Sequence, residues 1–158
     1  MTVVSNTSPL CYLVLIGHEE VLPKLYGSIL ATQTVLGELR HPAAPPAVRA
    51  WAKSPPAWVQ VRNDPPDTDN TLEALDPGER TAIRLAEQLH ADVVLMDELA
   101  ARKLATQRGL KVAGVLGVLG DASQAGLIDL PSALTALRRT NFRVAPELLR
   151  SLYTRFGK

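Results

Sequence analysis

The stretch ADVVLMDE, residues 91–98, decides the fold class. Its centre VVLM, residues 93–96, has no polar alternation, which predicts a short strand buried on both faces, as in a parallel sheet. Asp97 and Glu98 follow this strand directly. In open α/β folds, ligands bind at the carboxyl ends of parallel strands. The stretch therefore predicts a ligand site as well as a strand.

Strand-like and helix-like segments alternate on both sides of this stretch. Short apolar or β-branched runs predict further strands at residues 2–5, 28–31, 58–61 and 111–113. The expected helices with definite ends are residues 8–16, 19–25, 79–90, 99–108, 130–139 and 146–153; shorter ones carry Glu38 and Trp51, and another runs from Gly114 to Gly126. This order predicts a three-layer α/β/α sandwich with a mostly parallel central sheet, forming a single domain over residues 1–158.

Composition narrows the class of protein. No apolar run is long enough to span a bilayer, and the apolar segment 10–16 lacks the preceding basic region of a signal peptide. The single cysteine, Cys11, lies in an apolar stretch, where it is expected to pack as a small hydrophobe. We therefore expect a cytoplasmic protein. The formal net charge of +1 neither marks nor excludes a nucleic-acid binder, since a local basic stripe can coexist with an acidic site.

Four acids lie near the ends of separate elements: Glu38, Glu79, Asp97 and Glu98. Carboxylates gathered at one sheet edge repel one another unless a proton or a cation lies between them. Hard cations prefer oxygen ligands. The set therefore suggests a site for Mg²⁺ or Mn²⁺.

Each acid also has a purely structural interpretation. Asp97 could be the N-cap of the next helix, and Glu79 and Glu98 could be first-turn acids that the helix dipole favours. The spacing from Glu98 to Arg102 allows an ion pair, through which Arg102 would support the site. Glu38 lies between apolar neighbours and could simply face water between two buried positions. Taken together, the acids favour a site more than any one of them does alone.

Other site patterns are missing from the sequence. The three histidines share no spacing, and no Cys-x-x-Cys or His-x-x-x-His pair occurs, so a zinc site is not expected. There is no Gly-rich phosphate loop and no Gly-x-Ser-x-Gly elbow. Basic residues gather modestly at 102–111 and 138–155, where they could hold a phosphate backbone beside an acidic metal site.

The chain resembles PIN-domain proteins, in a branch related to VapC-type toxin ribonucleases. The segments that carry the resemblance are VVSNTSPL (residues 3–10), TVLGEL (34–39), LDPGERTAIRLAEQL (75–89), VVLMDELAARKLATQRGLKVAGVLGVL (93–119) and AGLI (125–128). They cover most of the chain in the right order. The resemblance implies a PIN-like α/β fold and a metal-dependent ribonuclease, in which acids at the strand ends hold one or two Mg²⁺ or Mn²⁺ ions.

The resemblance also assigns roles to individual residues. It implies that Glu38, Glu79 and Asp97 are catalytic and bind the metal, with Glu98 nearby as a further ligand. Ser8 matches the hydroxyl residue of the first motif.

Asn6 departs from the nuclease pattern, because it takes the place of the leading aspartate of the first motif. An asparagine keeps an oxygen that can bind a metal, but it contributes no negative charge. The loss of one anion weakens cation binding without necessarily abolishing it, since amide oxygens also coordinate hard cations.

Three functions follow from these observations. The favoured one is a PIN-type ribonuclease with RNA as its substrate, in one form the toxin of a toxin–antitoxin pair with an antitoxin protein as partner. Asn6 suggests an alternative, a catalytically degenerate PIN-like module that binds RNA or protein without turnover. A phosphate-accepting receiver domain is disfavoured, because its paired acids after the first strand and the lysine after its fifth are missing. The resemblance implies a homodimer, and residues 148–156 would suit an interface.

Overall fold

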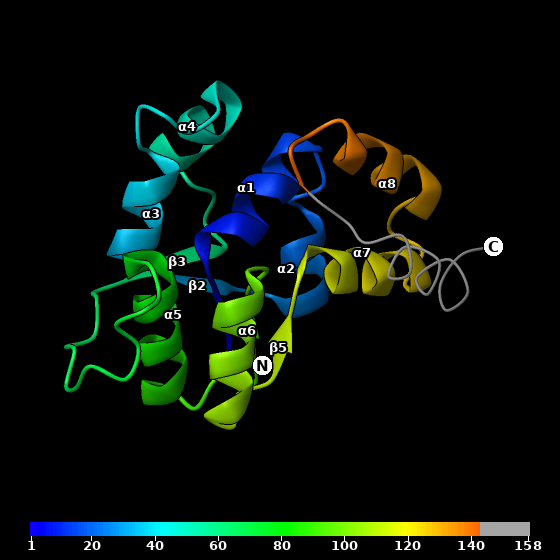
Figure 1. The fold of residues 1–158 in the computed structure, drawn as a ribbon. Coiled ribbons are helices and arrows are strands. Elements are labelled where there is room, and N and C mark those ends of the chain that lie inside the picture. The colour runs from blue at the N-terminus through cyan, green and yellow to red at the C-terminus, as the bar shows by residue number, and fades with distance from the viewer. Residues whose placement is uncertain (143–158) are drawn as a thin grey trace.

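One parallel sheet organises the protein, as the computed structural model, which describes residues 1–142, shows in Figure 1. Its strands are β1 (Val3–Ser5), β2 (Ile29–Thr32), β3 (Val59–Arg62), β4 (Val93–Leu95) and β5 (Val112–Ala113). They are ordered β3-β2-β1-β4-β5, and every neighbouring pair is parallel. The α/β fold with a parallel central sheet that the sequence predicts is confirmed.

Helices connect the strands. Residues 1–142 form α1 (Thr7–Leu15), α2 (Val21–Tyr26), α3 (Gln33–Leu39), α4 (Pro46–Lys53), α5 (Pro77–Gln88), α6 (Leu99–Gln107), α7 (Val115–Gln124) and α8 (Leu130–Arg138). None of them is long and apolar enough to cross a membrane. The helix expected at 146–153 and the interface expected at 148–156 lie outside the described residues.

Side chains that alternate across the sheet divide the core in two. Val3, Ile29 and Leu95 pack with α1, α2, α3, α7 and α8, whereas Val4, Leu30 and Val94 pack with α5 and α6 on the other face. Because successive strand residues point to opposite faces, a strand covered on both sides needs an unbroken apolar run. Burying one such side chain contributes about 1.5–3 kcal/mol. The VVLM run therefore belongs inside the sheet, and the structure has β4 between β1 and β5.

The strand order creates a topological switch point between β1 and β4. From β1 the chain builds outward through β2 and β3, and then it crosses back to add β4 and β5 on the other side. Ser5 is aligned with Leu95, and the Asn6 N–H donates to the Leu95 carbonyl at 2.9 Å. The residues that follow these two strands, Asn6 and Asp97, therefore emerge at the same edge. Ligands of open α/β sheets bind at such a point.

The start of α1 differs from the sequence prediction. The helix was expected to begin at Ser8, but it begins at Thr7 and its N-cap is Asn6, which has φ −78° and ψ 178°. The extended backbone of β1 continues through Asn6, so the helix can begin only at the next residue. The Asn6 side chain makes no capping hydrogen bond. It is therefore available for another role.

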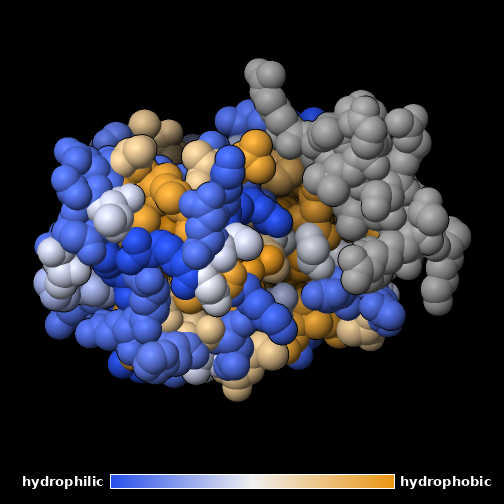
Figure 2. Space-filling view, turned by 60° about the horizontal axis from the view of Figure 1, so that its bottom comes forward, coloured by the Kyte–Doolittle hydropathy of each residue, from blue (hydrophilic) through white to orange (hydrophobic). Residues whose placement is uncertain are grey.

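Most large apolar side chains lie in the two cores. Those exposed among the described residues are Met1, Val61, Leu99 and Leu127. On the face that Figure 2 brings forward, hydrophilic residues cover much of the surface and apolar residues show between them.

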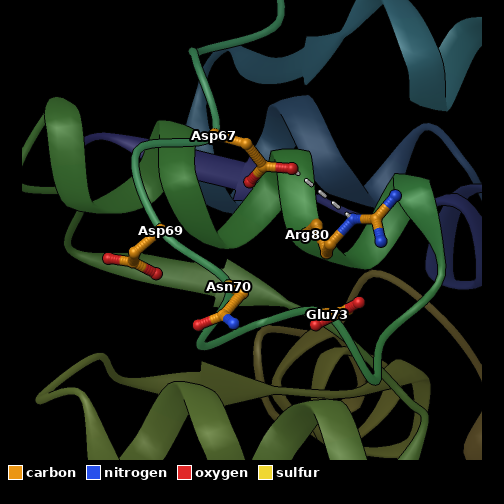
Figure 3. A pocket seen from close by; sticks show the side chains of 5 residues that line it. All are labelled: Asp67, Asp69, Asn70, Glu73 and Arg80. Carbon is orange, nitrogen blue, oxygen red and sulfur yellow. Dashed lines mark ion pairs between the residues drawn. The ribbon is translucent and has the colours of Figure 1, made fainter.

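A buried arginine forms hydrogen bonds with the polar loop between β3 and α5. Arg84 of α5 is 8% exposed, and its guanidinium bonds Asp69 Oδ1 at 2.8 Å and Asp67 Oδ1 at 3.3 Å. Figure 3 shows these acids beside a pocket of about 210 Å³ that Asp67, Asp69, Asn70, Glu73 and Arg80 line. Arg80 approaches Asp67 only to 3.9 Å. Among the ion pairs of this loop, those of Arg84 are therefore the closest, and the buried Leu72 and Leu75 also hold the loop against the core.

Replacing Arg84 should release this loop. In Arg84→Ala, amide hydrogen exchange at residues 63–75 should become faster, because the two charge-assisted contacts to Asp67 and Asp69 are lost. Arg80→Ala is the matched control, since it removes a cation from the same helix but only the 3.9 Å contact. Equal acceleration in both variants would contradict the assignment.

Candidate functional site

The carboxyl edge of the sheet collects the first turns of several helices. In a parallel sheet each strand ends at this edge, so the helix that follows begins there. The helices α1, α5 and α7 start here, and because the N–H groups of their first turns have no partner within the helix, they attract anions. The predicted site acids Glu38, Glu79 and Asp97 each accept a hydrogen bond from backbone N–H groups at or just before a helix start. Helix starts therefore set the geometry of the site.

Glu38 bridges two helices. It lies in the last turn of α3, where the Thr7 hydroxyl donates to its Oε1 and the Gly78 N–H donates to its Oε2 at 3.0 Å. Thr7 is the first residue of α1, and Gly78 is the second residue of α5. A Cβ on Gly78 would come within 2.9 Å of the Glu38 Cδ, closer than real Cβ atoms approach. Only glycine at this position leaves room for the carboxylate.

Glu79 is buried in the first turn of α5. It forms a capping box with Asp76: the Glu79 N–H donates to Asp76 Oδ1 at 2.8 Å, and the Asp76 N–H donates to Glu79 Oε1 at 3.1 Å. Burial raises the pKa of Glu79, as do the charges of Asp76, Glu98 and Glu38, while the bond from the Asp76 N–H lowers it. The structural interpretation of Glu79 as an acid in the first turn of a helix is thus correct. Its carboxylate also lies close enough to other acids to belong to a site with them.

Asp97 is held by the helix that follows the neighbouring strand. It does not cap α6, whose N-cap is Glu98; instead its Oδ1 accepts the Val115 N–H at 2.9 Å, at the start of α7. A Cβ on Gly114 would lie 2.6 Å from Asp97 Oδ1, so a glycine again makes the room. Burial raises the pKa of Asp97 to about 6, against the opposing effects of the Val115 N–H and the Arg102 guanidinium.

Two buried oxygens at the switch point have no hydrogen-bond partner: Asn6 Oδ1 and Asp97 Oδ2. Asn6 is 3% exposed. A buried polar atom without a partner costs about 1–3 kcal/mol. Both atoms are hard oxygen donors from adjacent strands, which is the donor chemistry that Mg²⁺ and Mn²⁺ prefer. The residues present therefore fit a divalent cation.

Three other predicted residues lie around this point. Glu98 is exposed, and within residues 1–142 no ion pair joins it to Arg102. Arg102 Nη1 donates instead to the Met96 carbonyl at 3.0 Å, which fixes the turn after β4. The Ser8 side chain makes no hydrogen bond in the described part of the chain, whereas its neighbour Thr7 does.

The acids are only partly brought together. The charges of Glu38 and Glu98 lie near enough to Glu79 to raise its pKa, whereas Asp97 responds to Arg102. Over residues 1–142, no three Asp, Glu, His or Cys side chains are arranged to hold a metal as they stand. The site thus consists of a Glu38–Glu79 part and an Asn6–Asp97 part at one sheet edge.

Sequence reasoning missed the residues that hold these acids in place: Thr7, Gly78, Gly114 and Val115. The signal was present in part, because Gly78 and Gly114 each lie at a predicted helix start. That each makes room for a carboxylate from another element follows only from the packing.

Substituting Gly78 should displace Glu38. Gly78→Ala should lower the free energy of unfolding by about 1–3 kcal/mol, because the added methyl overlaps the carboxylate. Adding Glu38→Ala should recover part of this loss in a double-mutant cycle measured by urea denaturation. Gly37→Ala is the control: it lies in α3 beside Glu38 with open space around it, and it should be stabilising by about 0.5–1 kcal/mol. Strict additivity of the two site substitutions would contradict the contact.

The raised pKa of Asp97 makes the stability of the metal-free protein depend on pH. Because the folded state holds this proton up to about pH 6, rather than to the ordinary 3.8, stability falls as the pH rises between the two values. Asp97→Asn removes this cost and keeps an oxygen for the Val115 N–H. In chelator at about pH 7.5 the variant should therefore be about 1–3 kcal/mol more stable than the native chain, and equal to it at about pH 4.

Thermal unfolding across this pH range tests the assignment. Asp121→Asn is the control, because it neutralises an exposed acid on α7 and should leave the pH dependence unchanged. A native-like pH profile for Asp97→Asn would contradict the burial of this carboxyl.

Comparison with known proteins assigns the family. A family model described as a PIN domain matches residues 2–158. The description indicates a nuclease-type module, and such domains generally depend on a divalent metal. No curated protein and no solved structure gives a significant match. Because the family model covers nearly the whole chain, the protein belongs to the PIN-domain family.

Proposed function

We propose that this protein is a metal-dependent ribonuclease of the PIN type. The observation that carries the proposal is the pair of buried, unpartnered oxygens, Asn6 Oδ1 and Asp97 Oδ2, at the switch point of a parallel sheet. Membership in the PIN-domain family supports it. A buried anion without a partner is expensive, and a bound cation would offset that cost.

The proposed ligands of an Mg²⁺ or Mn²⁺ ion are Asn6, Glu38, Glu79, Asp97 and Glu98. A bound ion supplies polarisation of the scissile phosphate and lowers the pKa of the attacking water. The chain's own residues orient the groups: Thr7 and Gly78 fix Glu38, and Val115 fixes one oxygen of Asp97 so that the other is free.

Glu79 suits the transfer of a proton. Its pKa is raised by burial and by neighbouring acids, and a base is most effective when its pKa approaches the working pH. The three residues proposed to be catalytic are therefore Glu38, Glu79 and Asp97, with Arg102 as a supporting residue that holds the turn after β4.

The proposed substrate is RNA, and the proposed partners are an antitoxin protein and a second copy of the chain. These follow from the resemblance to VapC-type toxins. Light scattering at micromolar concentration gives the oligomeric state directly.

Asn6 favours one alternative, a PIN-like module that binds RNA or protein without cutting it. The amide leaves the site one negative charge short of the nuclease pattern, which weakens the hold on a cation. The two functions differ in two measurable properties of the native chain, the binding of Mn²⁺ and the cleavage of RNA.

Calorimetry of Mn²⁺ binding and an RNA cleavage assay separate these functions. We expect micromolar binding by the native chain, tighter binding by Asn6→Asp because it restores a charge, and loss of both binding and cleavage in Asp97→Asn. Asp121→Asn controls for the loss of one negative charge outside the site. Binding only after Asn6→Asp would establish the degenerate module, and cleavage that survives Asp97→Asn would refute the proposed site.

A further inference from the structure

Residues 39–63 form one of the segments of the chain that carry only positive charge, and residues 99–120 form another. Residues 39–63 contain Arg40, Arg49, Lys53 and Arg62 and no Asp or Glu. The whole chain has a formal net charge of +1, so four cations here leave −3 for all other residues. Like charges gathered in one segment repel one another, and an anionic ligand relieves that repulsion. The charge distribution therefore points to an anion-binding surface that the overall charge conceals.

Three of these cations line one groove. Arg40, Arg49 and Lys53 surround a groove of about 650 Å³ on α4 and the α3–α4 connection, completed by Pro42, Pro46, Ala50 and Ser54. Two of its walls are prolines, which hold the backbone of the connection stiffly. The positions of the cations are thus set by a short helix and a rigid turn.

No carboxylate neutralises the cations of the groove. The ion pairs within residues 1–142 involve Arg80, Arg84 and Arg108, all on other elements. Arg40 Nε donates to the Ala52 carbonyl at 2.8 Å, which ties the end of α3 to α4, and Arg49 Nε is buried without a partner. Guanidinium groups bind phosphate oxygens through paired N–H donors. Apart from the bond of Arg40 Nε, the groove therefore offers cationic groups that are not in ion pairs within the described residues.

The groove begins beside the candidate site. Arg40 is the C-cap of α3, two residues after Glu38. In Figure 1, α4 lies next to α3 and beside α1, and the three helices pack together. A strand whose phosphates follow the groove is led towards the Glu38 part of the sheet edge.

Nearby aromatic side chains are not free for base stacking. Trp51 and Trp58 pack against each other with centroids 6.0 Å apart, and both pack against the apolar core. Recognition in the groove would therefore use phosphates rather than bases, and binding would depend on salt more than on sequence.

We propose that the α3–α4 groove binds the phosphate backbone of single-stranded RNA next to the cutting site, through Arg40, Arg49 and Lys53. The proposal rests on the proposed ribonuclease function. It adds the path of the substrate, and it predicts affinity without sequence preference.

The test is the salt dependence of RNA binding in chelator, where no metal-dependent cleavage interferes. Fluorescence anisotropy of a labelled oligouridylate is measured between about 50 and 300 mM salt for the native chain and for Arg49→Gln/Lys53→Gln. Arg40 is left in place because it links α3 to α4. The double variant should bind more weakly. Its log affinity should also fall less steeply with log salt, by about 1.4 in the slope, because each phosphate contact to a single strand contributes about 0.7.

The control removes the same charge at the other end of the sheet. Lys24→Gln/Lys111→Gln replaces two exposed lysines that precede β2 and β5, and its slope should equal that of the native chain. If the double variant in the groove unfolds, the single variant Lys53→Gln replaces it, because Lys53 is exposed. This variant should make the salt dependence less steep by about 0.7.

The outcomes distinguish this proposal from the ribonuclease itself. Mn²⁺ binding should be unchanged in Arg49→Gln/Lys53→Gln, since the groove is not the cation site. Cleavage by the native chain with an unchanged salt slope in the variant would overturn the groove and leave the ribonuclease standing. A less steep salt dependence in the variant, with no cleavage by the native chain, would support the groove and refute the ribonuclease function. Binding of polyglutamate but not of RNA would overturn the choice of ligand.

Discussion

Backbone N–H groups at helix starts hold the candidate site together. A parallel sheet brings the first turns of its helices to one edge, and those turns carry donors that the helices cannot satisfy themselves. Gly78 and Val115 each give such a donor to a carboxylate from another element, Glu38 and Asp97. In both cases a glycine removes the Cβ that would block the approach. The positions of the acids are therefore set by the backbone, which changes little when side chains elsewhere are substituted.

This arrangement lowers the stability of the folded protein. The buried Asp97 carboxyl has one bonded oxygen and one without a partner, and its pKa is raised to about 6. A domain with only an ordinary margin of stability tolerates such a feature when the rest of the fold determines it strongly. Here the two apolar cores on the faces of the sheet hold β1 and β4 in place. The burial that raises the pKa of Asp97 is the same burial that would strengthen its attraction for a cation.

The sequence was sufficient for the fold and for part of the site. The VVLM run and the alternation of strands and helices predict the parallel sheet correctly, because burial on both faces leaves a clear pattern. The predicted start of α1, Ser8, was one residue late, since the helix begins at Thr7, directly after the extended Asn6 backbone that continues β1. The contacts of Glu38 with Thr7 and Gly78 span 31 and 40 residues, and such long-range contacts are decided by packing rather than by local pattern. The ion pair that the spacing allows between Glu98 and Arg102 is not formed, and Arg102 Nη1 donates to the Met96 carbonyl instead.

The strand order also has a consequence for how the protein is made. Asn6 leaves the ribosome before its neighbour at the switch point, Asp97, which is synthesised roughly 90 residues later. At about 5–20 residues per second, this interval lasts on the order of 5–20 s. The Val115 N–H that positions Asp97 comes later still. During synthesis the nascent chain therefore lacks the assembled site, and its apolar first strand must wait for the partner that completes the sheet.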